Sequence, residues 1–128
     1  MALRRIITGS AFAVALLAGG VAQAHPHLVG SSPRANSVVA ATSRVSLTFS
    51  ERLLAPMSGG DVIMTRHPGV PHHMPMKIDG FKASVAPDGK TLQLIAARPL
   101  ATGSYQVKWH AVAADTHRVA GAFAFQVR

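Results

Sequence analysis

The stretch that decides the fold is Tyr105-Gln106-Val107-Lys108-Trp109, in which apolar and polar side chains alternate residue by residue. The same period of two recurs in residues 45–49 and 123–127. Successive side chains of a strand point to opposite faces, so this pattern indicates strands that each bury one face. No stretch shows the three-and-four spacing of a long amphipathic helix, so an all-β fold is predicted.

Shorter apolar runs predict further strands over residues 27–30, 61–64, 81–85 and 91–96, separated by turns rich in Pro and Gly. Ala86-Pro87-Asp88-Gly89 has Pro and Gly where a tight hairpin turn requires them. About seven short strands between turns describe a seven-stranded Greek-key β-sandwich or small barrel. The cysteine pair of antibody-type, immunoglobulin-like domains is absent.

Residues 1–24 predict an export signal. A basic start precedes an apolar run over residues 11–18, and Ala22-Gln23-Ala24 is a small-x-small triplet of the kind that signal peptidase cuts after. The apolar run is shorter than the roughly 20 residues of a membrane span, which disfavours an uncleaved anchor. We therefore expect cleavage after Ala24 and one exported domain over residues 25–128.

The composition excludes several classes of function. The chain has no cysteine, so thiolates serve neither as nucleophiles nor as metal ligands. Of its 13 Lys and Arg residues, Arg4 and Arg5 leave with the signal, and 11 remain against 5 Asp and Glu. These cations are scattered singly, which disfavours nucleic-acid binding and indicates a solvated surface or weak attraction to an anionic membrane. No Gly-x-Ser-x-Gly turn or phosphate-binding glycine loop is present.

Cleavage after Ala24 would give His25 a free α-amine beside its imidazole. Two nitrogens on one residue can close a chelate ring and suit Cu(II), which prefers nitrogen in a tetragonal arrangement. Pro26 has no amide proton, so the amino-terminal chelate that His27 at position three would otherwise complete is unavailable. Further ligands must come from elsewhere in the fold, unless cleavage merely happens to expose a histidine.

Asp115 and His117 are the candidates for those ligands. They lie in a polar connection between the strands predicted over residues 105–111 and 122–127. Two residues that are two positions apart on an extended segment point the same way, so both side chains would reach one ion. The alternative is an Asx-type turn at Asp115 with an exposed His117.

A second cluster of soft donors lies between Met64 and Met76. Within thirteen residues, three methionines and three histidines occupy a Pro-rich segment after a strand: Met64, His67, His72, His73, Met74 and Met76. Thioethers select Cu(I), and imidazole is compatible with it. The segment therefore predicts a soft-metal loop in preference to a merely solvated one.

Taken together, these residues resemble the CopC family of periplasmic copper-resistance proteins. The resemblance rests on residues 25–29 after the signal, residues 47–51, the Met/His loop, the strand 105–109, and Asp115-Thr116-His117 with Gly121. It covers the whole mature chain. It implies a cupredoxin-like β-sandwich without catalytic activity that carries copper in the periplasm, beside an inner-membrane protein of the CopD type implicated in copper uptake.

The resemblance also implies where copper binds. The Cu(II) site falls on His25, through its amine and imidazole, with Asp115 and His117, and Glu51 matches a glutamate near that site. Within the loop, Met64, His72 and Met76 map best onto the Cu(I) site of methionine-rich members. His67, His73 and Met74 are substitutes, since His67 stands where such members have methionine. His27 either adds to the Cu(II) site or points away from it.

Two alternatives come from other classes of protein. A copper monooxygenase also uses an N-terminal histidine, but it needs an aromatic surface to hold a polysaccharide. Tyr105 and Trp109, the one Tyr and the one Trp, share the apolar face of a strand and are expected in the core. The other alternative is a structural β module without a metal.

Overall fold

The computed structural model describes residues 25–128, and the signal expected over residues 1–24 lies outside them. The described chain forms strands β1 (Leu28–Ser32), β2 (Val38–Val39), β3 (Arg44–Phe49), β4 (Gly59–Arg66), β5 (Met76–Lys77), β6 (Lys82–Val85), β7 (Thr91–Ile95), β8 (Gly103–Val112) and β9 (Arg118–Val127), with one 3-10 turn, η1 (Ala55–Met57). Each of the seven predicted strands is confirmed. β2 and β5 went unpredicted because two residues are too few to show a period.

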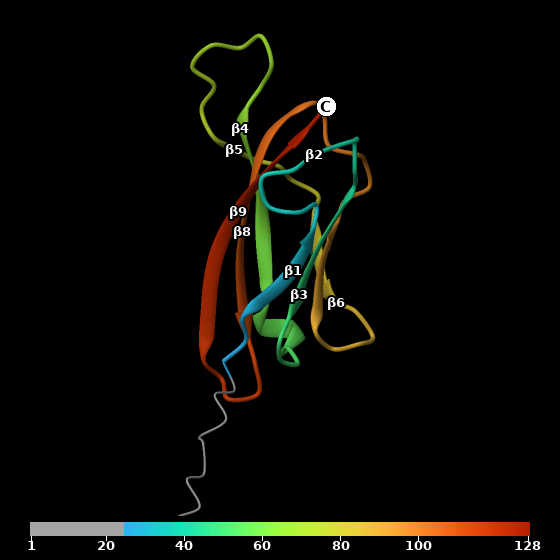
Figure 1. Ribbon diagram of the computed structural model, residues 1–128, viewed down its shortest axis with the longest axis vertical. Helices are drawn as coiled ribbons and strands as arrows, with labels where there is room; N and C mark the ends of the chain where they lie inside the picture. The colour runs from blue at the N-terminus through green and yellow to red at the C-terminus, as the bar shows by residue number, and fades with distance from the viewer. Residues whose placement is uncertain (1–24) are drawn as a thin grey trace, which may run out of the picture.

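The strands pack as a two-layer sandwich (Figure 1). One sheet has the order β1-β3-β7-β6 and is called the first sheet below; the second sheet has the order β2-β9-β8-β4-β5. The chain changes sheet on entering β2, β3, β4, β6 and β8. The long loop between β4 and β5 and the tight connection between β8 and β9 lie at opposite ends of the sandwich (Figure 1).

The core forms where the alternating strands turn their apolar sides inward. The first sheet contributes fully buried Val45, Leu47 and Phe49 from β3, and the second contributes Tyr105 and Val107 from β8 among others. The Tyr105 hydroxyl donates to the carbonyl of residue 101 at 2.6 Å, so its polar end is satisfied.

Trp109 packs its ring edge-on against Phe49, with 5.1 Å between centroids. Tyr105 is therefore a core residue, as the sequence predicts, and Trp109 is half-buried and packs against the core.

The turn between β6 and β7 has the predicted form. The amide of Gly89 donates to the carbonyl of Ala86 at 2.9 Å, and Gly89 has φ of 73°, which favours glycine. The Asp88 carboxylate accepts hydrogen bonds from the Thr91 hydroxyl and from the amides of Lys90 and Thr91. The Thr91 hydroxyl and those amides hold the pKa of Asp88 below its usual value.

Gly121 on β9 makes room for the indole that faces it across the sheet. Gly121 is the cross-strand partner of Trp109, and a Cβ built on it would lie 2.5 Å from Trp109 Cζ2. We expect Gly121→Val to destabilise the protein by about 1–3 kcal/mol, because the added side chain overlaps the indole and Trp109 would have to leave its packing against Phe49.

Urea unfolding measures that difference in the free energy of unfolding. Ala122→Val is the matched control, because Ala122 is exposed and pairs with exposed Lys108. Ala122→Val is expected to change the free energy of unfolding by no more than about 0.5 kcal/mol. Equal destabilisation by the two variants would contradict the packing argument.

Candidate metal centre

The described chain begins with an anchored segment. The side chain of Pro26 is fully buried, although its neighbours His25 and His27 are exposed. The His27 amide donates to Ser50 Oγ at 3.1 Å, and the Ser50 amide donates back to the His27 carbonyl at 3.0 Å. Pro26 and Ser50 therefore fix where His25 lies. No sequence pattern had pointed to Ser50.

The connection between β8 and β9 is a tight turn, and the prediction of an extended segment there is wrong. The Thr116 amide donates to the Ala113 carbonyl at 2.9 Å, and Thr116 has φ of 66°. The His117 amide donates to Asp115 Oδ1 at 3.1 Å, which is the Asx-type turn that the sequence had offered as the alternative. This turn itself brings the side chains together, because His117 Nδ1 also lies 3.1 Å from Asp115 Oδ2.

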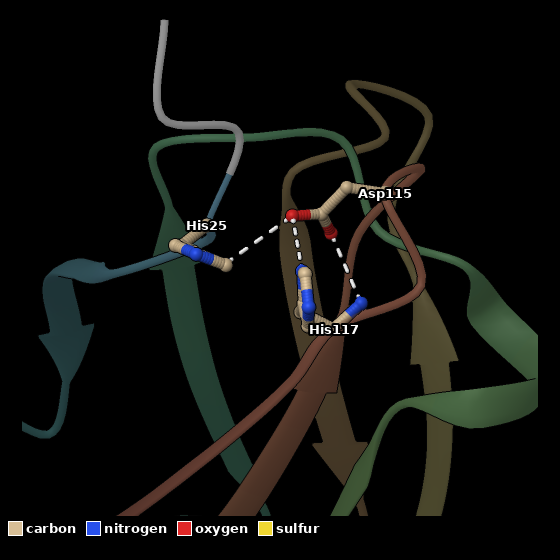
Figure 2. Close-up of side chains that lie close together, drawn as sticks. All are labelled: His25, Asp115 and His117. Carbon is tan, nitrogen blue, oxygen red and sulfur yellow. Dashed lines mark hydrogen bonds and ion pairs between the residues drawn. The ribbon is translucent and has the colours of Figure 1, made fainter. Parts of the chain in front are cut away.

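His25 completes a three-residue cluster with Asp115 and His117 (Figure 2). His25 Nδ1 lies 3.2 Å from Asp115 Oδ2, the same oxygen that faces His117. The two imidazole rings meet edge to face, with centroids 4.7 Å apart and planes at 64°. One potential ligand atom from each residue lies within 4.8 Å of the others. Among the His, Asp and Glu side chains of residues 25–128, these three are close enough together to hold one metal ion.

The electrostatics of the cluster favour a cation. The Asp115 side chain is 22% exposed, and the two histidines are more open at 48% and 69%. The hydrogen bond from the His117 side chain, with smaller contributions from its amide and from His25, holds the pKa of Asp115 below its usual value. The carboxylate is therefore ionised at neutral pH and lies between two imidazoles, each of which offers nitrogen as a ligand to a metal ion.

His27 and Glu51, which the sequence placed near the Cu(II) site, make no direct contact with the cluster in the described part of the chain. His27 Nδ1 lies 3.0 Å from Ser50 Oγ, so this ring serves the anchor of the N-terminal segment. Glu51 is half-buried on the segment that follows β3, and no hydrogen bond or ion pair joins it to His25, Asp115 or His117.

The Met/His loop divides into two parts. Met64 is a core residue, 4% exposed, and is the cross-strand partner of Met76, which is 53% exposed. Met64, His67 and Met76 line one apolar hollow of about 510 Å³ beside Leu100 and Tyr105. Two thioethers and one imidazole therefore face a common space.

The other histidines of the loop lie in a second hollow. His72 and His73 line it together with His67. The rings of His67 and His73 stack with 6.2 Å between centroids, and His73 Nδ1 is buried without a hydrogen-bond partner. Met74 is 79% exposed and lines neither hollow. The six predicted soft donors are thus not gathered at one point.

Comparison with known proteins assigns the family. The model of the CopC domain matches residues 28–128, which is nearly the whole described chain. The chain belongs to the CopC family. Among curated CopC-family relatives, the copper resistance protein C of Xanthomonas campestris pv. juglandis is 42% identical over 99% of this chain and 98% of its own. The protein of the same description from Pseudomonas syringae pv. tomato is 41% identical over the full length of both chains.

Solved structures of CopC-family proteins have the same fold. PcoC, a methionine-rich copper resistance protein from Escherichia coli, superposes with a TM-score of 0.75 at 39% identity, over 82% of this chain and all of its own. CopC from Methylosinus trichosporium OB3b superposes with a TM-score of 0.63 at 30% identity, over 80% of this chain and 93% of its own. The predicted family and the predicted all-β sandwich are confirmed. In residues 25–128, no helix has the length and apolar character to cross a membrane.

Proposed function

We propose that this protein is a periplasmic copper carrier that binds Cu(II) at its mature N-terminus and has no catalytic activity. The observation that carries the proposal is that the imidazoles of His25 and His117 both lie against the same carboxylate oxygen of Asp115. Relatives named copper resistance protein C support copper as the ion. A CopD-type inner-membrane protein is the proposed recipient.

The donor set fits Cu(II) chemically. Two imidazoles, one carboxylate and the free amine of His25 would give three nitrogens and one oxygen, which suits the tetragonal preference of Cu(II). The amine becomes available only if the signal is removed after Ala24. Because Pro26 lacks an amide proton, the chain cannot wrap the ion by itself, and the ligands on the β8–β9 turn are required.

A Cu(II) titration of two proteins tests this proposal. One begins at His25, and the other carries one additional glycine before it. We expect the first to bind one Cu(II) and the second to bind at least about 100-fold more weakly, which corresponds to about 2.7 kcal/mol. Electron paramagnetic resonance should show one nitrogen fewer in the extended form. Equal affinities would show that the amine is no ligand, and absence of binding in both would favour a structural β module.

Tyr105 is buried and Trp109 is half-buried against the core, which supports a carrier over a polysaccharide monooxygenase, because such an enzyme needs exposed aromatic rings. The copper-loaded protein is accordingly expected to consume no oxygen with ascorbate and polysaccharide beyond the rate of free copper. Polysaccharide-dependent oxygen consumption would contradict the carrier proposal.

We further propose that the loop binds Cu(I) through Met64 and Met76, with His67 as the nearest imidazole. The supporting observation is that these three residues share one hollow, whereas Met74 lies outside it. His72 and His73 are then secondary donors from the neighbouring hollow.

Met76→Leu removes one sulfur and keeps the volume, and it should weaken Cu(I) binding at least about tenfold, or 1.4 kcal/mol. Met74→Leu is the matched control and should change the affinity less than about twofold, well under 1 kcal/mol. Competition with a chromogenic Cu(I) chelator measures both. A larger loss in the Met74 variant would reverse the assignment.

A further inference from the structure

The outer face of the second sheet carries an excess of positive charge. Exposed Arg66, Lys77, Lys108 and Arg118 come from β4, β5, β8 and β9 of that sheet. The carboxylate on the same face is Asp61, the cross-strand partner of Lys108. Lys77 Nζ already pairs with Asp61 Oδ1 at 3.0 Å. Lys77 and Asp61 therefore neutralise each other, and this cationic face keeps three cations, Arg66, Lys108 and Arg118, without an ion pair among the described residues.

The centre of the cationic face is low and open to close approach. Lys108, His110 and Arg118 line a hollow of about 480 Å³ together with Asp61 and the small residues Ala120 and Ala122. Four of the nine residues that line this hollow are glycine or alanine, so the basic side chains stand beside short ones. A flat, negatively charged surface can therefore meet the cations without a steric obstacle.

The cations are spread out and do not converge on one point. Arg66 lies at the level of Ser104 on β8, and Arg118 lies at the level of Val112. Eight residues of strand separate the two levels, or about 26 Å. An array of this length fits an extended surface of negative charge better than one small anion. We propose that the cationic face docks on an anionic lipid bilayer.

Docking in this orientation would leave both ends of the sandwich accessible. The turn that bears Asp115 and His117 lies at one end of the second sheet, and the loop between β4 and β5 lies at the other (Figure 1). A protein lying on this face holds both ends at the membrane surface, where a membrane partner can reach them. The attraction itself depends on Lys and Arg side chains, so the proposal stands independently of copper binding.

The first sheet provides a matched control. Exposed Arg44 and Lys82 flank Ile95 on its outer face, and neither side chain forms a hydrogen bond or ion pair in the described structure. Arg44→Glu with Lys82→Glu changes the net charge as much as Lys108→Glu with Arg118→Glu. The two double variants differ only in which face is reversed.

The test is sedimentation of the copper-free protein that starts at His25, which contains every described strand, with two kinds of vesicle. One kind contains equal parts of phosphatidylglycerol and phosphatidylcholine, and the other contains phosphatidylcholine alone. At an ionic strength of about 0.1 M, where the Debye length is about 10 Å, we expect retention on the anionic vesicles only.

Each basic residue near such a surface contributes about fivefold in binding, so reversing Lys108 and Arg118 should weaken retention at least about tenfold. The Arg44 and Lys82 variant should lose less than about threefold in retention, because its charges lie on the far sheet, at least about 10 Å further from the bilayer, where salt screens them.

Two results would overturn the proposal. If the unaltered protein stays in solution with anionic vesicles, the face does not dock on lipid, and an acidic protein becomes the better partner. If both double variants lose retention equally, net charge acts without a preferred face. Trp109 emission and urea midpoints verify folding, and Lys108→Gln with Arg118→Gln repeats the test with smaller changes in charge.

Discussion

Asp115→Ala is expected to abolish most Cu(II) binding, with an affinity at least about 100-fold lower. Loss of a residue that only orients a metal ligand lowers the metal affinity about 10–100-fold. Asp115 has both roles, because its Oδ2 faces His25 and His117 while its Oδ1 accepts the His117 amide that shapes the turn. Its removal therefore deletes an anionic donor and releases an imidazole at once. Titration with Cu(II) under a competing chelator measures the change.

Asp115→Asn separates the two roles of this side chain. An amide oxygen can still accept the His117 amide and keep the turn, but the negative charge is gone. We expect an affinity between those of the unaltered protein and the alanine variant. Asp79→Asn, an exposed carboxylate on the segment between β5 and β6, is the control for net charge and should leave affinity unchanged. An alanine variant that binds within about twofold of the unaltered protein, well under 1 kcal/mol, would remove Asp115 from the site.

The strands were predictable because their signal is local. In β3, β8 and β9 the side chains alternate between core and solvent, so the burial of residues such as Val45 and Val107 can be predicted from the local sequence pattern. The turn at Ala86–Gly89 is equally local, since Pro87 and Gly89 specify its backbone. β2 was not predictable, because its two residues pair in parallel with the distant strand β9.

The residues proposed for the site can be picked out in the sequence, but the geometry of their cluster cannot. A histidine after a cleavage triplet and an Asp-x-His pair are visible in the sequence, as are the soft donors of the loop. The turn at Thr116 was missed because the left-handed φ of a threonine has no sequence signal. The anchor at Ser50 was missed because it joins residues 23 positions apart. The burial of Met64 against Met76 likewise depends on the pairing of β4 with β5.

Pro26→Ala is expected to change the Cu(II) ligands altogether in the protein that starts at His25. Alanine restores an amide proton at position two, so the amine, two deprotonated amides and the His27 imidazole can wrap the ion without help from the fold. The buried ring that seats the segment is lost as well, and His27 is free to leave Ser50. Four nitrogens give a stronger ligand field than three nitrogens and an oxygen, so the visible absorption band should move to shorter wavelength.

A double-variant comparison decides whether Pro26 has this role. In the unaltered chain, His117→Ala should weaken Cu(II) binding by at least about tenfold, or 1.4 kcal/mol, because the proposed site takes one ligand from the β8–β9 turn. In the Pro26→Ala background, the same substitution should have almost no effect, because the ion no longer needs the turn. Equal losses in both backgrounds would mean that the ion stays on the turn even when the amide is available. The proline would then act only as a buried anchor, and the missing amide proton would not be what directs copper to Asp115 and His117.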